Sequence, residues 1–452
     1  MKQVHFISIG GSVMHSLAIA LKQRGLKISG SDDEIYEPSR SRLKDHGLLP
    51  VRDGWHEENI HAGIEAVILG MHARADNPEL RKAQQMGLPI YSFPEFIRET
   101  AEDKQRIVIA GSHGKTTITA MIMHVLRHHG RRFDYLVGAQ VPGFENVVQI
   151  SDAPIMIIEG DEYLSSAIDP NPKFLRYEHH IGLISGIAWD HVNVYGTYDE
   201  YVHQFERFAD VTPKAGTLVF CEDDNLAMMI ASNERRDVSQ VHYNVHPYEV
   251  INNTYYLLAQ QQRIPLRIFG RHNMLNLNGA RMVLQRLGIT EDLFYQAIVT
   301  FEGASKRLQL LRENEFTAVF LDFAHAPSKV EATTQALKER YRSRKLTACL
   351  ELHTFSSLNR AYIDQYEDSL SAADSACIFI NPANRKKPGA EALGAEEITA
   401  AFKFDGLRVF SDPGEMMAFL QEMNWREHNL LLMSSGNFAQ SDLQLLAANI
   451  CP

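Results

Sequence analysis

The stretch that decides the fold around it is Arg106-Ile-Val-Ile-Ala-Gly111-Ser-His-Gly114-Lys115-Thr116-Thr117. Its apolar first part predicts a buried strand over residues 106–110, and the spacing of apolar residues after it predicts a helix over 116–129. The glycines between them let the backbone approach a phosphate group, and the free N–H groups of a helix N-terminus point at such an anion. Lys115 would add a charge at the β- and γ-phosphates, and the Thr116 hydroxyl would reach Mg²⁺.

Strand–helix alternation extends to both sides of this stretch. Before it, an apolar run over residues 4–9 ends in Gly10-Gly11 and leads into helical spacing over 13–24. After it, the alternation restarts at residue 318, with strands predicted at 318–321, 346–350, 376–380, 408–410 and 430–433. Such alternation is typical of parallel sheets with crossover helices. We therefore expect an α/β fold with three domains, over residues 1–99, 100–304 and 305–452.

Composition and charge exclude several classes of protein. The chain has 452 residues, 45% hydrophobic and 22% charged, as expected of a globular protein of about three domains. Its net charge of −11 argues against a nucleic-acid partner. The four cysteines form no CxxC pair, which favours a reducing compartment over disulfides or a zinc site. No apolar run approaches the ~18 residues of a membrane span, so we expect a cytoplasmic protein without a membrane partner.

Acidic and glycine-rich segments at strand ends are further candidate sites. Glu159-Gly-Asp-Glu162 follows an apolar strand, where α/β sheets bind ligands and where a carboxylate could hold Mg²⁺, although an acidic surface turn would look the same. Asp190-His191 follows the next strand and could equally cap a helix. Gly10-Gly11 with Asp32 is a partial dinucleotide motif, so an NAD-dependent oxidoreductase is one alternative function.

The loop over residues 111–117 resembles the G-T-x-G-K-T-[ST] phosphate loop of the Mur ligase family, the ATP-dependent ligases of peptidoglycan synthesis. Three later segments also resemble family motifs: Gly270-Arg-His-Asn273 (G-x-H-N, before a helix expected at 276–287), Lys306-Arg307 (a basic pair), and Asp322-Phe-Ala-His325-Ala-Pro327 (D-[YF]-A-H-x-P). The resemblance implies ATP binding by Gly111, Ser112, His113, Gly114, Lys115, Thr116, Thr117, Asn273, Arg307, Asp322 and His325.

The resemblance also implies the remaining site residues. Magnesium would be held by Thr116, Glu159 and His191, and catalysis would use Lys115, Arg307 and His191. The N-terminal domain would be Rossmann-like and bind UDP through Gly10, Gly11, Ser31 and Asp32. The central domain would be a P-loop ATPase-like domain, and the C-terminal Rossmann-like domain would close on ATP and bind the incoming amine. The sequence has Gly186 and Ala188 where the family has Asn and Glu, and no lysine between His191 and Lys214 that could be carbamylated, so a second metal site stays open.

The function implied is that of an ADP-forming carbon–nitrogen ligase that works through an acyl phosphate. Its partners would be UDP-N-acetylmuramate and a small peptide or amino acid, and the chain would be a monomer or homodimer. Val141-Pro-Gly143-Phe144, Asp322-Phe-Ala-His325 and Leu432-Met-Ser-Ser-Gly436 favour the branch that adds the tripeptide L-Ala-γ-D-Glu-meso-diaminopimelate during peptidoglycan recycling. Two alternatives remain: the branch that adds L-alanine, and a catalytically inactive nucleotide-binding homologue.

Overall fold

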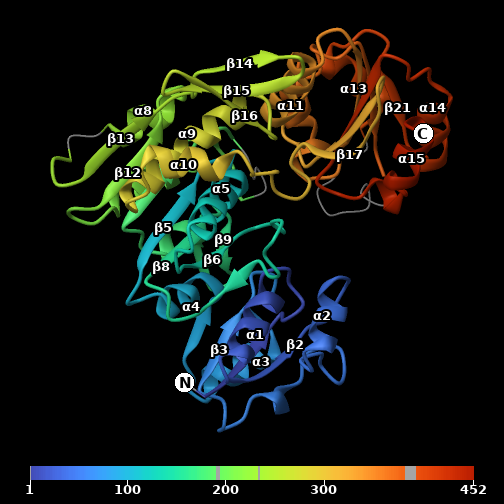
Figure 1. The fold of residues 1–452 in the computed structure, drawn as a ribbon. Helices are drawn as coiled ribbons and strands as arrows, with labels where there is room; N and C mark the ends of the chain where they lie inside the picture. The colour runs from blue at the N-terminus through green and yellow to red at the C-terminus, as the bar shows by residue number, and fades with distance from the viewer. Residues whose placement is uncertain (1, 190–193, 233–234, 382–392) are drawn as a thin grey trace. The chain divides into compact units, whose positions relative to one another are not determined.

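The structure is a computed structural model that describes residues 2–189, 194–232, 235–381 and 393–452. It confirms the predicted α/β class. The chain forms two compact units, drawn as a ribbon in Figure 1. The first unit comprises Met1–Ile187, Val202–Tyr243 and Gly279–Phe294, and the second comprises Ala188–Tyr201, Asn244–Asn278 and Tyr295–Pro452.

The first unit begins with a four-stranded parallel sheet in the order β2-β1-β3-β4. Its strands form from short, mostly apolar runs such as residues 4–7, all of which are fully buried. Helix α3 begins where Asn77 accepts hydrogen bonds from the N–H groups of Glu79 and Leu80, and Pro78 suits its first position. The elements are β1 (Gln3–Ile7), α1 (Met14–Gln23), β2 (Lys27–Ser31), α2 (Ser39–Asp45), β3 (Ala66–Leu69), α3 (Pro78–Gln85), β4 (Ile90–Ser92) and α4 (Phe93–Thr100).

A seven-stranded sheet in the order β13-β12-β11-β5-β8-β6-β7 forms the rest of the first unit. All neighbouring strands are parallel except β6 and β7. The central strand β5 therefore lies between β11 and β8. The elements are β5 (Gln105–Ala110), α5 (Lys115–His128), β6 (Asp134–Leu136), β7 (Val148–Gln149), β8 (Ile155–Glu159), the hairpin β9 (Leu164–Ser166) and β10 (Asp169–Pro172), α6 (Lys173–Arg176), β11 (Ile181–Ile184), α7 (Tyr198–Asp210), β12 (Thr217–Cys221), α8 (Asn225–Ala231), β13 (Ser239–Tyr243) and α10 (Glu291–Ile298). Helix α7 begins in the second unit, and α10 ends there.

The second unit contains a small antiparallel sheet, β14-β15-β16, and a six-stranded sheet in the order β17-β18-β22-β19-β20-β21. In the larger sheet only β17 is antiparallel to its neighbour. The elements are β14 (Tyr248–Ile251), β15 (Thr254–Ala259), β16 (Gln262–Leu266), α9 (Arg271–Arg286), β17 (Gln309–Glu313), β18 (Ala318–Asp322), α11 (Pro327–Arg340), β19 (Lys345–Glu351), α12 (Arg360–Ile363), β20 (Ser375–Phe379), α13 (Ala395–Phe402), β21 (Arg408–Phe410), α14 (Pro413–Glu422), β22 (His428–Met433) and α15 (Leu443–Ile450). Helix α9 begins in this unit and ends in the first.

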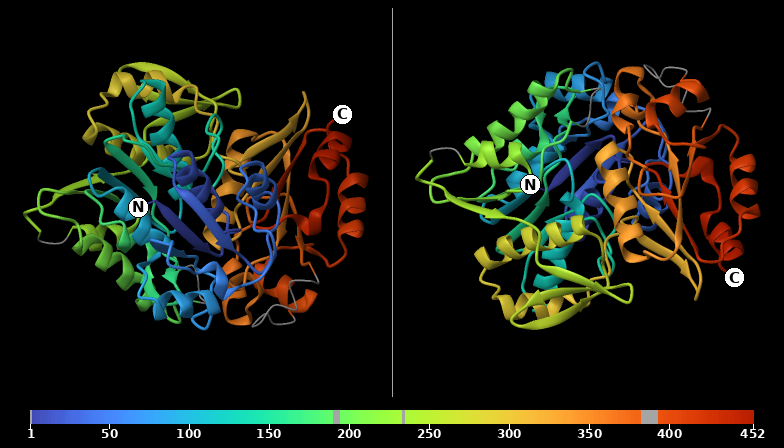
Figure 2. Two further views of the ribbon diagram at one scale, coloured as in Figure 1. Left: turned by 90° about the horizontal axis from the view of Figure 1, so that it is seen from below. Right: turned by 90° about the horizontal axis from the view of Figure 1, so that it is seen from above.

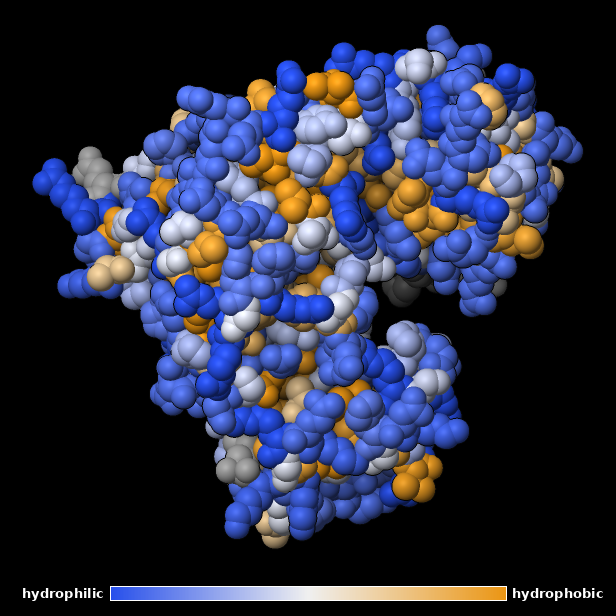
Figure 3. All heavy atoms as spheres, in the orientation of Figure 1, coloured by the Kyte–Doolittle hydropathy of each residue, from blue (hydrophilic) through white to orange (hydrophobic). Residues whose placement is uncertain are grey.

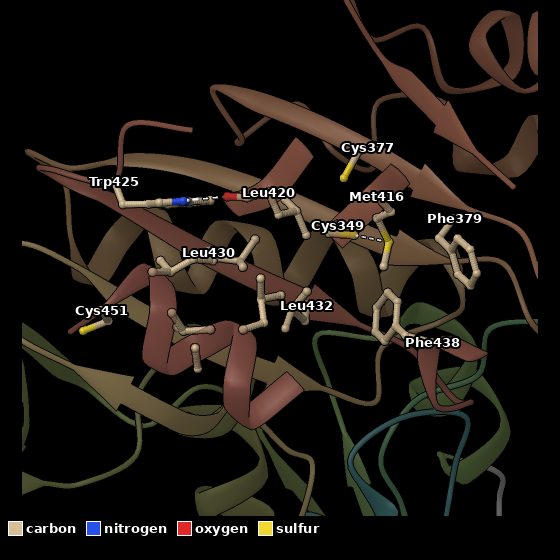
Figure 4. Close-up of a cluster of buried hydrophobic side chains, with 14 residues drawn as sticks. Cys349, Cys377, Phe379, Met416, Leu420, Trp425, Leu430, Leu432, Phe438 and Cys451 are labelled. Carbon is tan, nitrogen blue, oxygen red and sulfur yellow. Dashed lines mark hydrogen bonds between the residues drawn. The ribbon is translucent and has the colours of Figure 1, made fainter. Parts of the chain in front are cut away.

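One face of the six-stranded sheet packs against α14 and α15. Buried side chains from the strands, including Phe379 and Leu432, meet Met416, Leu420 and other side chains of these helices (Figure 4). The two helices, coloured red, lie together along one side of the sheet in Figure 2. Cys349 and Cys377 face each other in adjacent strands of this core as free thiols.

The surface drawn in Figure 3 is mostly polar, with single apolar side chains scattered over it, as is usual for a globular protein. Among the helices that the structure describes, none combines the length and apolar character needed to cross a membrane.

The predicted start of one helix is wrong. The spacing of apolar residues indicated a helix over 276–287, whereas α9 begins at Arg271. Gly270 immediately precedes it with φ +91°, a conformation that suits glycine, and so sets the true start. Asn273 therefore lies in the first helical turn and does not precede the helix.

Candidate functional site

The loop over residues 111–114 connects β5 to α5 at the centre of the seven-stranded sheet. Because β11 and β8 are parallel to β5 on either side, the carboxyl ends of all three strands meet at the same edge. Polar groups that follow β11 and β8 therefore lie next to the loop. This is where α/β sheets bind ligands.

Gly111 holds the loop close to the segment after β11. Its φ is +128°, and a Cβ at this position would lie 2.1 Å from Ser185 Oγ and 2.9 Å from the Ser185 backbone nitrogen. The Ser185 N–H donates to Ala110 O at 3.0 Å, and the Ser112 N–H donates to Gly186 O at 2.9 Å. Only glycine fits here, so the loop backbone stays open toward an anion.

Lys115 is the first residue of α5 and folds back over the loop. Its Nζ donates to Gly111 O at 2.5 Å and to Glu162 Oε2 at 2.7 Å, and the Glu162 side chain is fully buried. Burial lowers the pKa of Lys115, but the negative charges of Glu162, Asp161 and Glu159 outweigh burial and raise that pKa. The lysine is therefore a fixed cation beside the loop.

Thr116 and Glu159 form a pair of oxygen ligands suited to magnesium. The Thr116 hydroxyl donates to Glu159 Oε1 at 2.7 Å, and the Gly138 N–H donates to Glu159 Oε2 at 2.6 Å. A hydroxyl and a carboxylate match the donor set that Mg²⁺ takes from a protein when phosphates and water supply its other positions. The pair thus fits the ion. Within the described ranges, no cluster of three or more His, Cys, Asp or Glu side chains could hold a metal.

A cavity of about 220 Å³ in the first unit joins this sheet edge to the glycine turn after β1. Lys115 and Glu159 line it together with Gly11 from the turn. Its other lining residues are Ser8, Ser12, Val13, Met14, Gly70, Met71, His72, Phe93, Leu136, Gly138, Asp161, Ser165, Lys173 and Tyr177. The structure therefore brings Lys115 of the phosphate-loop segment and Gly11, a predicted UDP-binding residue, to the same cavity.

The other predicted UDP-binding residues support the glycine turn from behind. The Gly10 N–H donates to Asp32 Oδ2 at 2.7 Å, and burial raises the pKa of Asp32 to about 6. Ser31 is buried and donates to Glu79, which lies 3.2 Å from His5 Nε2. Gly10, Ser31 and Asp32 do not line the cavity.

In the second unit, Asp322 organises the other predicted nucleotide residues. Its carboxylate accepts from the N–H groups of Leu308 at 2.6 Å and Ala324 at 2.7 Å, and so ties the segment after Arg307 to the end of β18. The Arg307 guanidinium lies 4.5 Å from the Phe323 ring centroid. His325 packs edge-on against the same ring at 5.2 Å. Arg307, Asp322 and His325 thus form one cluster.

The two remaining predicted site residues are Asn273 and His191. Asn273 is buried, and its Nδ2 donates to Phe269 O at 2.8 Å, one turn earlier in the chain. Asp190 and His191 lie outside the described residues, so the predicted role of His191 stays a prediction.

Sequence reasoning missed Lys173, Gly138 and His72, which the fold brings to the cavity from separate segments. Lys173 is the most informative of them, because its Nζ lies 2.6 Å from Asp161 Oδ2. Nothing in the spacing of the sequence marks it as different from a surface lysine. The acidic segment 159–162 was the one indication that a cation such as Lys173 lies nearby, because buried carboxylates need cations beside them.

Comparison with known families gives three matches in chain order. The model described as Mur ligase family, catalytic domain, matches residues 3–105, the Mur ligase middle domain matches 109–284, and the Mur ligase, glutamate ligase domain matches 306–436. These matches confirm the predicted three-domain α/β architecture.

Curated relatives align over most of the chain. The UDP-N-acetylmuramate–L-alanine ligase of Carboxydothermus hydrogenoformans is 29% identical over 99% of this chain and 96% of its own length. The enzyme of the same name from Caldicellulosiruptor bescii is 32% identical over 86% of this chain and 85% of its own.

Solved structures share the fold over nearly the whole chain. A UDP-N-acetylmuramate–alanine ligase from Thermotoga maritima has a TM-score of 0.74 at 20% identity and covers 97% of both chains. A murein peptide ligase from Psychrobacter arcticus has a TM-score of 0.69 at 20% identity and covers 99% of both.

Proposed function

We propose that this chain, which belongs to the Mur ligase family, joins the lactyl carboxylate of UDP-N-acetylmuramate to the amine of an amino acid or short peptide. Members of the family are ATP-dependent, ADP-forming amide-bond ligases that serve peptidoglycan biosynthesis, and the chain is an enzyme of this class. The identity of the two substrates is the proposal.

The observation that carries the proposal is the shared cavity. Lys115, the lysine at the end of the phosphate loop, lines one part of it, and Gly11 of the turn after β1 lines another. A UDP-sugar bound at the turn would direct its lactyl carboxylate toward the γ-phosphate of ATP bound at the loop. Such positioning converts an encounter of two reactants into a reaction within one complex.

In the proposed reaction, a lactyl carboxylate oxygen attacks the γ-phosphorus, and ADP leaves. The amine then attacks the resulting acyl phosphate, and inorganic phosphate leaves. Loop N–H groups and Lys115 would bind the phosphates of ATP, and Arg307 would neutralise the transferred group. Magnesium, when held by Thr116 and Glu159, would supply positive charge beside these phosphates.

Two amine acceptors are candidates. L-alanine is the first, supported by the names of curated relatives that align with most of the chain. The tripeptide L-Ala-γ-D-Glu-meso-diaminopimelate is the second, supported by Val141-Pro-Gly143-Phe144, Asp322-Phe-Ala-His325 and Leu432-Met-Ser-Ser-Gly436. The murein peptide ligase structure, which shares the fold over 99% of the chain at 20% identity, is compatible with the second acceptor as well.

Release of ADP tests the proposal and separates the acceptors. The enzyme is incubated with ATP, Mg²⁺ and UDP-N-acetylmuramate, and either L-alanine or the tripeptide is added. Because a site built for one acceptor leaves polar groups unpaired with the other, the rates should differ by orders of magnitude. Faster release with L-alanine supports the first acceptor, and faster release with the tripeptide assigns the second. No release with either, in an enzyme that binds ATP, would indicate an inactive homologue and refute the proposal.

A further inference from the structure

Two carboxylates of the loop after β8 each accept a hydrogen bond from a lysine of another segment. Glu162 accepts from Lys115 at 2.7 Å, and Asp161 accepts from Lys173 at 2.6 Å. Both lysine side chains are largely buried, with 15% and 16% of their surface exposed, and both line the same cavity. Lys115 belongs to the phosphate-loop segment, whereas Lys173 opens α6, outside that segment.

The backbone of Lys173 is held firmly in place. Lys173 opens the short helix α6, and its N–H donates to Tyr163 O at 2.9 Å. The next N–H, from Phe174, donates to Asp161 O at 3.1 Å, and the Phe174 ring is fully buried against Phe205 and Phe208. These contacts fix the backbone from which the side chain extends, and the ion pair with Asp161 holds its ammonium group at the cavity.

Lys173 retains capacity to bind an anion. An ammonium group has three N–H donors, and among the residues the structure describes its carboxylate partner is Asp161. Its charge reaches farther into the cavity: burial, and then the positive charge of Lys173, lower the pKa of His72, another lining residue. An anionic group entering the cavity beside Lys173 would meet this positive charge.

The proposed reaction needs a second cation of this kind. The lactyl carboxylate and the γ-phosphate are both anions, and they must approach to bonding distance although like charges repel. Lys115 is engaged at the phosphate loop. A separate cation for the carboxylate would lower the repulsion and fix the attacking oxygen.

We propose that Lys173 binds the lactyl carboxylate of the muramoyl substrate and places it for attack, with Asp161 holding the ammonium group in position. The inference rests on the proposed function for the identity of that substrate. A purely structural role, in which the Lys173–Asp161 pair only ties two segments together, is the alternative to be tested.

The test compares two ligands that differ in the lactyl group. Binding of UDP-N-acetylmuramate and of UDP-N-acetylglucosamine, which lacks the lactyl carboxylate, is measured by calorimetry for the native enzyme and for Lys173→Met. The variant should bind UDP-N-acetylmuramate about 10- to 100-fold more weakly, the loss expected for one hydrogen bond between charged groups, and should bind UDP-N-acetylglucosamine as the native enzyme does. Lys173→Arg should recover part of the difference.

Lys403→Met is the matched control, because Lys403 forms an exposed ion pair with Glu367 in the second unit. It should change neither affinity. Equal weakening of both ligands by Lys173→Met, or no weakening of either, would overturn the inference. A native enzyme that binds UDP-N-acetylmuramate but releases no ADP with either acceptor would refute the proposed function, while the comparison of the two ligands would still decide the role of Lys173.

Discussion

The change Gly111→Ala tests the geometry of the phosphate loop. Gly111 has φ +128°, and its missing Cβ would lie 2.1 Å from Ser185 Oγ, 2.9 Å from Ser185 N and 3.2 Å from Gly186 N. A rotation of the Ser185 side chain could relieve the first contact. The other two involve backbone atoms, so the loop itself would have to move and would strain the hydrogen bond from the Ser112 N–H to Gly186 O.

The free energy of unfolding should fall accordingly. A non-glycine residue in this backbone region costs about 1–3 kcal/mol, and inserting a methyl group into a filled space costs about 1–3 kcal/mol more. Gly130→Ala is the control: Gly130 also has positive φ, +63°, but no atom lies within 4 Å of its Cβ position. We expect Gly130→Ala to cost about 1–2 kcal/mol, from the backbone alone.

Urea unfolding of the full chain measures both variants, and ADP release measures the loop. Gly111→Ala should lose more free energy of unfolding than Gly130→Ala and should release little ADP, whereas Gly130→Ala should keep its activity. Adding Ser185→Ala to Gly111→Ala should recover only part of the stability, because the backbone contacts remain. If Gly111→Ala were as stable and active as Gly130→Ala, the close approach of Gly111 to Ser185 would be wrong.

Three further predictions concern charged groups of the site. Lys115→Ala should lower turnover at least ~10³-fold, as removal of other charge-stabilising groups does, and near-native ADP release would refute its role. Glu159→Gln should raise the Mg²⁺ concentration needed for half-maximal ADP release while leaving the fold intact; an unchanged magnesium dependence would exclude Glu159 as a ligand. Asp32, with its pKa raised to about 6, binds a proton more tightly in the folded than in the unfolded chain, so ionisation of this carboxyl destabilises the fold as the pH rises from about 4 to 6. In urea unfolding, the free energy of unfolding of Asp32→Asn should therefore rise by about 2 kcal/mol relative to that of the native protein between pH 4.5 and 6.5. A difference between the two proteins that stays constant with pH would contradict the raised pKa.

The local signals in the sequence predicted most elements well. Buried parallel strands such as β5, β18 and β19 lie where short apolar runs predicted them, because such runs need no information from distant residues. Helix α9 is the exception: its first turn carries Arg271, His272 and Asn273, which interrupt the apolar pattern. Asn273 and its neighbours could be recognised by motif, but their helical conformation could not.

By itself, the sequence determined the α/β class and the phosphate loop, because apolar runs, glycines and a helix start act through neighbouring residues. Tertiary structure alone decided which distant groups complete the site. Gly138, Lys173 and Leu308 donate hydrogen bonds to Glu159, Asp161 and Asp322, respectively. The first two contacts depend on the strand order β11-β5-β8-β6 and on the loops at that sheet edge, and the third depends on the segment before β17 reaching the end of β18. Each contact stabilises the protein only when residues far apart in the chain come together, so a local sequence pattern cannot predict it.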